Sequence, residues 1–393
     1  MLNTQKIESD QFSTSFAKIL RTLLDFPLQI TNNNKTIIAK TVLFLFGLFL
    51  FLFALDLMGS SFQHLSKDSL KSIINAASNP FIGLFIGLLV TALIQSSSTT
   101  TTMVVTAVAT GSITLQNAIP IIMGANVGTT ITSTIIALGY IGKKSEFERA
   151  ISAGVIHDIF NISIVFLLFP LEYKYSLLTN SAEYFIELLN ISAVDNVSTA
   201  VKFKLFDLTS LVQLFDKLMP SAILSLLLSF ILLFISIKII SKIIYNFIIG
   251  RTENRLQRYV FNDNFQSFSW GALATAVVQS SSITTSLIVP LVATGKTSLK
   301  KVMPFVLGAN IGTTVTAFIA VMYQSQTAFS IAIAHLLFNI IGVAFYLSSP
   351  VLRHFLVWLA SQFGHIAERY KFTIFIYILL VFFVIPFLLI FLN

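Results

Sequence analysis

The sequence predicts an all-α integral membrane protein built from two related halves, and three observations support this prediction. The 393 residues are 55% hydrophobic and only 11% charged, and the mean hydropathy is +0.85. The apolar residues form long blocks, such as 40–62 and 372–393, which reach the roughly 20 residues that a helix needs to cross a bilayer. Polar motifs of the first half also recur in the second half at a constant spacing.

The charged residues fit this class of protein. The net charge is +8, but Lys and Arg lie in short connectors between apolar blocks, where they orient a membrane protein. We therefore expect no nucleic-acid partner and a lipid bilayer as the surroundings. The absence of Cys excludes disulfides and thiolate metal sites. Residues 1–36 are polar and do not resemble a signal peptide, so we expect a cytoplasmic N-terminal segment.

One polar unit occurs twice in the chain. The run QSSSTTTT begins at Gln95, and QSSSITTS begins at Gln279, 184 residues later. The same spacing relates GANVGTT at 124–130 to GANIGTT at 308–314. Because the matching residues are mainly Gln, Ser, Thr, Asn and Gly, shared hydrophobicity does not explain the match, and we infer a duplication.

Basic connectors set the expected orientation. The connectors 143–149 and 251–258 are rich in Lys and Arg and are expected on the cytoplasmic side. The segment 171–217 between them carries both signs of charge and is expected to be an external loop. This arrangement gives about seven or eight spanning helices. Helices at 41–62 and 219–247 open the two halves.

The segments 79–113 and 268–295 are too short and broken to be simple spans. Each consists of two short arms that meet at a QSSS motif, so each is expected to be a re-entrant helical hairpin. The first enters from outside and the second from the cytoplasm, because the basic connectors flank only the second. Hairpin-plus-helix units of inverted topology are typical of secondary transporters, whose site lies near the bilayer midplane.

The QSSS motifs are the expected anion site. Broken backbone at membrane depth is tolerated only where protein buries it or where it lines a wet cavity. Each motif places a carboxamide, hydroxyls and free backbone N–H groups at the start of a half-helix, where the dipole favours an anion. The candidate residues are Gln95, Ser96, Ser97, Ser98, Gln279, Ser280, Ser281 and Ser282.

The GANVGTT and GANIGTT motifs are the expected cation site. Their glycines permit unwound backbone with exposed carbonyls, and their Thr and Asn side chains add oxygen ligands that suit sodium. The candidates are Thr129, Thr130, Thr313, Thr314, Asn126 and Asn310. Neither motif contains a charged residue. A bound anion would therefore need bound cations to neutralise it, which couples the two ions.

These polar residues have three other interpretations. Small and hydroxylated residues also let membrane helices pack closely, although four clusters in two register-matched copies favour a site. The HDIFN run places His157 and Asp158 in a predicted span, either to handle ions or to form structural hydrogen bonds. A serine nucleophile is rejected because no GxSxG elbow accompanies the serines. We therefore expect no enzyme.

The paired QSSS motifs, the two glycine-rich motifs and SEFERA followed by HDIFN resemble the type II sodium-coupled inorganic phosphate cotransporters. The resemblance implies sodium-driven phosphate uptake by alternating access, with Na+ as the co-transported ion and no organic cofactor. It also implies shared roles in the phosphate and sodium sites for Gln95, Gln279, Asn126, Asn310, Thr313 and Thr316. The chain lacks the cysteine-tied external loop of the animal members, so a multi-pass protein of the bacterial inner membrane is expected.

Several alternatives stay open at this point. The substrate could be another small anion, such as sulfate or a carboxylate, although carboxylate carriers often offer an Arg and none lies near these motifs. A channel would carry the anion without sodium coupling, and a structural membrane protein would carry nothing. A homodimer is also open.

The expected organisation has five parts. They are an N-terminal segment (1–36), a first transmembrane repeat (37–170), an external loop (171–217), a second inverted repeat (218–348) and C-terminal helices (349–393). In the last part, residues 351–365 either lie along the cytoplasmic interface or cross the membrane.

Overall fold

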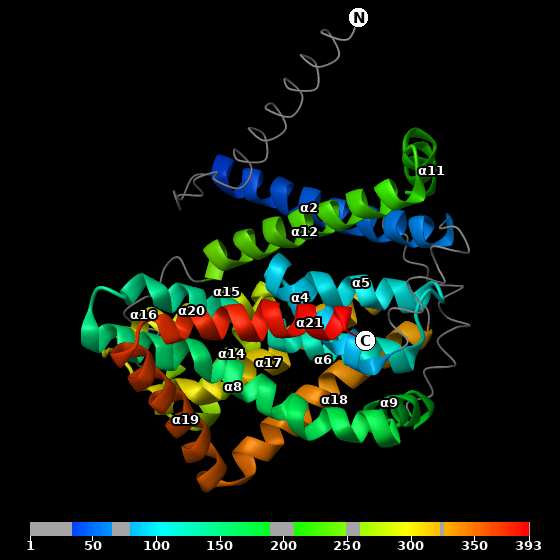
Figure 1. The fold of residues 1–393 in the computed structure, drawn as a ribbon. Helices are drawn as coiled ribbons and strands as arrows, with labels where there is room; N and C mark the ends of the chain where they lie inside the picture. The colour runs from blue at the N-terminus through cyan, green and yellow to red at the C-terminus, as the bar shows by residue number, and fades with distance from the viewer. Residues whose placement is uncertain (1–33, 65–78, 189–207, 249–259, 323–325, 393) are drawn as a thin grey trace, which may run out of the picture.

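The computed structural model of the chain describes residues 34–64, 79–188, 208–248, 260–322 and 326–392. Within these ranges every regular element is a helix, as predicted (Figure 1). The expected cytoplasmic segment before residue 34 and the connector 251–258 lie outside the described residues.

The helices alternate between long spans and short broken pieces. The first half contains α2 (Asn34–His64), α4 (Pro80–Ile94), α5 (Ser97–Ala109), α6 (Leu115–Gly128), α7 (Ile131–Ala137), η1 (Leu138–Tyr140), α8 (Lys144–Tyr175) and α9 (Leu177–Leu188). The rest contains α11 (Thr209–Leu218), α12 (Ala222–Ile248), α14 (Asn264–Val278), α15 (Ser281–Ser286), α16 (Ile288–Ala293), α17 (Leu299–Val321), α18 (Gln326–Ser348), α19 (Pro350–Arg369), α20 (Phe372–Leu379), η3 (Leu380–Val384) and α21 (Ile385–Phe391).

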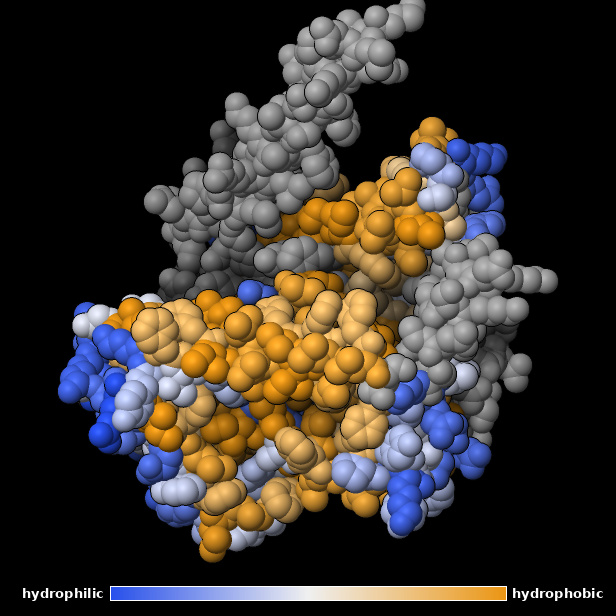
Figure 2. Space-filling view, in the orientation of Figure 1, coloured by the Kyte–Doolittle hydropathy of each residue, from blue (hydrophilic) through white to orange (hydrophobic). Residues whose placement is uncertain are grey.

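Six helical segments of the described chain are long and apolar enough to cross a membrane. They are Ala39–Met58, Leu115–Tyr140, Lys144–Tyr175, Leu299–Val321, Thr327–Ser348 and Phe372–Phe391. Figure 2 shows a broad apolar band across the middle of one face, with hydrophilic residues gathered toward its edges. The protein is therefore a multi-pass, all-α membrane protein. The helix α12 has 27 residues, but its described apolar part, Ala222–Leu233, is shorter than a span.

Each QSSS motif joins two helical arms. The arms α4 and α5 meet at Gln95 and Ser96, and the arms α14 and α15 meet at Gln279 and Ser280. Beyond α15 the helix continues through Leu287, which has helical backbone angles, into α16. We call these two broken-helix units the first and second hairpins.

Glycines hold each hairpin against the helix that follows it. A Cβ atom on Gly124 of α6 would lie 1.8 Å from the Leu84 carbonyl oxygen of α4. The second half repeats this contact, since a Cβ on Gly308 of α17 would lie 2.0 Å from the Phe268 carbonyl oxygen of α14. Only glycine allows such close backbone approach. The hairpins are thus fixed by packing at matched positions.

The glycine-rich motifs are helical, which corrects one expectation. We expected unwound backbone at 124–130 and 308–314, but α17 runs without a break through the whole of its motif, and α6 is regular as far as Gly128. Only a turn at Thr129 and Thr130 separates α6 from α7. The glycines serve close packing instead of unwinding.

The two hairpins return to opposite ends of α8. This helix has 32 residues, so it is about 48 Å long at 1.5 Å per residue. Near its start, Arg149 Nε donates to the Ala293 carbonyl oxygen at the end of the second hairpin at 2.9 Å. Just past its other end, Ser176 Oγ accepts from Gln116 Nε2 beside the end of the first hairpin at 3.1 Å.

The remaining helices enclose this arrangement. The helices α2 and α12 pack side by side and form, with part of α5, a separate apolar cluster that includes Phe51, Leu57 and Leu233 (Figure 1). The external segment expected at 171–217 is partly helical, because α8 continues through Pro170 to Tyr175 and is followed by α9.

The close packing of α4 on α6 yields the first testable prediction. We expect Gly124→Ala to lower the stability by about 1–3 kcal/mol, because its methyl group would overlap the backbone of α4. The matched control is Gly139→Ala, where nothing lies within 4 Å of the added atom. Thermal unfolding in detergent measures both variants. Equal unfolding temperatures would contradict the packing role.

Candidate functional site

The two QSSS turns have the same backbone conformation. Gln95 has φ 57° and ψ 34°, and Gln279 has φ 56° and ψ 28°, so both adopt the left-handed conformation. Side chains other than glycine seldom adopt it, and it costs about 1–3 kcal/mol. Glycine would relieve this strain, yet Gln occupies both turns.

A serine caps the helix that leaves each turn. Ser96 Oγ accepts from Thr99 N at 3.2 Å, and Ser280 Oγ accepts from Ile283 N at 3.3 Å. The first backbone bonds of these helices run from Thr100 N to the carbonyl of Ser96 and from Thr284 N to that of Ser280. The backbone N–H groups before those donors face the turn, at the positive end of the helix dipole.

The tips of the two hairpins meet. Ser98 Oγ of the first hairpin donates to the Gln279 carbonyl oxygen of the second at 2.8 Å. Ser282 Oγ of the second hairpin lies 2.9 Å from Thr129 Oγ1, in the turn between α6 and α7. The two motifs, 184 residues apart in sequence, therefore form one polar centre.

The serines at this centre differ in accessibility and partners. Ser97, Ser98, Ser281 and Ser282 are buried. Within the described residues Ser281 Oγ has no hydrogen-bond partner, although it is fully buried. A buried hydroxyl without a partner is costly unless a ligand or water satisfies it. Gln95, by contrast, is exposed at the first tip.

The hydroxyl groups expected to bind a cation lie in two settings. Thr129 and Thr316 face the opposite hairpin, and Thr316 Oγ1 accepts from Ser98 Oγ at 3.3 Å. The hydroxyls of Thr130, Thr313 and Thr314 donate to carbonyl groups of their own helices. Their oxygen lone pairs stay free to accept or to coordinate a cation.

The two Asn residues join the halves through a pair of crossing contacts. Asn126 of the first half lies with its Oδ1 atom 3.2 Å from Nε2 of His335 in the second. Asn310 of the second half lies with its Oδ1 atom 3.2 Å from Nε2 of His157 in the first. Since each Asn Nδ2 donates to its own helix, each Oδ1 accepts and each His Nε2 donates.

Asp158 lies on α8 outside this crossing pair. Its Oδ2 atom accepts from Thr134 Oγ1 at 2.9 Å and from Tyr377 Oη at 3.0 Å. The residue at the matching position of the second half is Leu336, so this contact has no counterpart there. Of the two roles weighed for Asp158, the structure shows hydrogen bonds that tie α8 to α7 and α20.

Sequence reasoning missed several members of the site. His335 was not among the predicted site residues, and its contact with Asn126 was not anticipated. Thr91 and Thr100 brace the arms of the first hairpin through their hydroxyls at 2.9 Å, as Thr275 and Thr284 do in the second at 2.7 Å. The 184-residue spacing relates these two pairs and could have revealed them, whereas no sequence signal marked Tyr377.

A multi-pass helical membrane protein with two broken helices that meet at a polar centre is typical of membrane transporters. The family can also be stated. A sequence profile described as Na+/Pi-cotransporter matches residues 50–181 and 232–368, which is more than half of the chain. The chain belongs to this family, which is a family of transporters and not of enzymes.

Two relatives of the chain are named as sodium-dependent phosphate transport proteins. The chain is 30% identical to "Sodium-dependent phosphate transport protein 2A" of Ovis aries over 88% of its own length and 66% of the relative. It is 28% identical to "Sodium-dependent phosphate transport protein 2B" of Homo sapiens over 89% of its length and 64% of the relative. The chain thus spans about two thirds of these relatives. Comparison with the solved structures gives no significant match.

The crossing contacts yield the second prediction. In a double-mutant cycle of His335→Leu and Asn126→Leu, we expect a coupling of about 0.5–3 kcal/mol, because each side chain satisfies the other in the interior. Denaturant unfolding in detergent gives the four stabilities. The control cycle pairs His335→Leu with Ser348→Ala near the end of α18, where the effects should add. Additivity in both cycles would show that the contact carries no energy.

Proposed function

We propose that the chain is a symporter that couples sodium entry to the uptake of inorganic phosphate. The observation that carries this proposal is the meeting of two helix starts, rich in hydroxyl and N–H donors, at a centre without fixed charge. Membership of the Na+/Pi-cotransporter family and the printed names of the relatives support the same substrate and ion.

In this proposal the two tips share one phosphate ion. A tetrahedral oxyanion can accept hydrogen bonds from the free N–H groups of both helix starts and from the serine hydroxyls. The proposed ligands are Gln95, Ser96, Ser97, Ser98, Gln279, Ser280, Ser281 and Ser282. The unpartnered hydroxyl of Ser281 is the strongest single candidate, because a bound oxygen would satisfy it.

Sodium ions would supply the missing positive charge. The proposed ligands are the side chains of Gln95, Asn126, Thr129, Thr130, Gln279, Asn310, Thr313, Thr314 and Thr316. A phosphate dianion at a buried site without Arg or Lys is poorly held alone, because burial of an unpaired charge is costly. A sodium ion beside it removes much of this cost, so each ion raises the affinity of the other.

The proposed mechanism is alternating access. The ends of the two hairpins lie at opposite ends of α8, so each hairpin can gate one side of the membrane. Loading with sodium and phosphate would let the tips close on the outer side and part on the inner side. The proposed location is the bacterial inner membrane.

The third prediction concerns Ser281→Ala. Because the Ser281 hydroxyl has no protein partner within the described residues, its removal should leave the unfolding temperature unchanged. Loss of a hydrogen bond to a charged ligand costs about 1.5–3 kcal/mol, so we expect KM for phosphate to rise roughly 10- to 100-fold. Uptake of labelled phosphate into proteoliposomes measures this. Gln279→Ala should also reduce uptake.

The control for Ser281→Ala is Ser348→Ala, because Ser348 is exposed and donates only to its own helix, at the Phe345 carbonyl. If Ser281→Ala takes up phosphate with an unchanged KM, the site assignment is wrong.

The fourth prediction separates this proposal from an uncoupled channel and from carriers of other anions. Uptake of labelled phosphate should require sodium outside, should fall sharply when potassium replaces it, and should stop accumulating when the sodium gradient is zero. Excess sulfate or a small carboxylate should compete weakly. Accumulation in potassium alone would refute sodium coupling, and strong competition by sulfate would change the substrate.

A further inference from the structure

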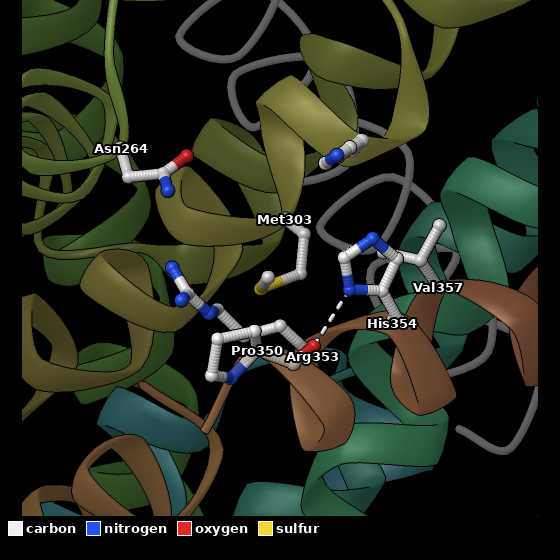
Figure 3. Close-up of a pocket in the computed structure, with 7 residues that line it drawn as sticks. Asn264, Met303, Pro350, Arg353, His354 and Val357 are labelled. Atoms are coloured by element: carbon white, nitrogen blue, oxygen red, sulfur yellow. Dashed lines mark hydrogen bonds between the residues drawn. The ribbon is translucent and has the colours of Figure 1, made fainter. Parts of the chain in front are cut away.

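A small basic pocket lies far from the QSSS centre, between the first turns of α14 and α17 and the first half of α19 (Figure 3). Its volume is about 220 Å³. It is lined by Asn264, Lys300, Met303, Pro350, Arg353, His354 and Val357. None of these lining residues is acidic, so the pocket offers positive charge without a carboxylate to neutralise it.

The cations of this pocket lack partners. Neither Lys300 nor Arg353 forms an ion pair with any residue that the structure describes, and the buried Nε of Arg353 has no hydrogen-bond acceptor there. His354 donates from Nδ1 to the Pro350 carbonyl oxygen at 2.7 Å, so its Nε2 can donate to an anion only when the ring is an imidazolium (Figure 3). A guanidinium with a buried, unsatisfied N–H calls for an anionic oxygen.

The helix α19, beside this pocket, has the pattern of a helix that lies along a membrane surface. Its buried side packs on α8, where a Cβ on Gly364 would lie 2.6 Å from the Glu148 carbonyl oxygen. Its other side exposes an apolar stripe at helical spacing, formed by Val351, Phe355, Trp358 and Ile366. In Figure 1 α19 lies steeply inclined to α8 and α20, and it is not among the candidate spans. An amphipathic helix of this kind lies in the bilayer interface.

The ends of the elements beside the pocket carry the basic residues that orient the protein. Lys143, Lys144, Arg149 and Lys296 lie on this side, which the distribution of Lys and Arg assigns to the cytoplasm. The cytoplasmic leaflet is the one that holds anionic lipids.

We propose that this pocket binds the phosphate group of an anionic phospholipid of the cytoplasmic leaflet. Lys300, Arg353 and the imidazolium form of His354 would hold the phosphate oxygens, while Met303 and Val357 would contact the glycerol. At about 220 Å³ the pocket is smaller than the roughly 300–1,000 Å³ that encloses a drug-sized ligand. It therefore takes a headgroup, and the acyl chains lie along the exposed stripe of α19.

Free inorganic phosphate would offer the same anionic oxygens as a lipid phosphate group. The largely apolar lining of the pocket favours the lipid. This inference does not rest on the transport proposal, since it concerns binding at a different place and its test measures no uptake.

The test uses purified full-length protein in a neutral detergent. Short-chain phosphatidylglycerol is titrated, and the shift in unfolding temperature gives the dissociation constant; short-chain phosphatidylcholine and inorganic phosphate are the comparison ligands. For the double variant Lys300→Gln/Arg353→Gln we expect at least a tenfold weaker affinity for phosphatidylglycerol. The matched control is Lys143→Gln/Lys144→Gln, which removes the same charge at the same end from exposed positions and should stay within about twofold of the wild type.

Three outcomes would overturn the proposal. The first is that both double variants bind phosphatidylglycerol with equal affinity. The second is that phosphatidylcholine stabilises the protein as strongly as phosphatidylglycerol does. The third is that Lys300→Gln/Arg353→Gln loses its stabilisation by inorganic phosphate, which would make the pocket a site for free phosphate. The single variant Lys300→Gln is used in case the loss of Arg353 disturbs folding, because Lys300 is exposed. This variant should bind phosphatidylglycerol at least threefold more weakly than the wild type.

Discussion

The contact between the two hairpin tips is the interaction on which the rest of the structure depends. A helix broken in the middle of a membrane protein leaves backbone groups without partners, and those groups must be satisfied by protein, water or ligand. Here the broken ends face each other, and the Ser98 hydroxyl meets the backbone of Gln279. The close glycine packing of each hairpin on its following helix, and the crossing of His157 and His335 to the Asn residues of the other half, all hold the tips in this position.

The two halves share the backbone of the centre but differ in the side chains at its edges. Backbone angles, serine caps and glycine contacts repeat almost identically in the two halves. The side chains at the edges do not repeat. Ser133 of the first half reaches Thr285 at 2.9 Å, but its counterpart is Ala317, and the hydroxyl of Thr101 is left without a partner in the described structure. The hydrogen bonds around the two hairpins therefore differ between the halves.

Much of this arrangement could be predicted from the sequence. Long apolar blocks gave the helical membrane fold, and the constant 184-residue spacing gave the two matching hairpins. The helical state of the glycine-rich motifs could not be read in the same way, because glycine serves both to unwind a helix and to let two helices touch. Deciding between these needs the position of the partner helix, here Leu84 or Phe268. The bond from Tyr377 to Asp158 was equally hidden, because it joins residues far apart without a repeated pattern.

The claim that the second hairpin must move against the first half during transport can be tested by linking the two. The chain has no Cys, so the double variant Ser133→Cys/Thr285→Cys introduces the only pair of thiols, at side chains that are not proposed ligands and whose hydroxyls lie 2.9 Å apart. After oxidation in proteoliposomes, we expect a disulfide between the halves by mass spectrometry, loss of phosphate uptake until a reductant is added, and slower linking when sodium and phosphate are present together. Full uptake by the linked protein, or no link at all, would contradict the account.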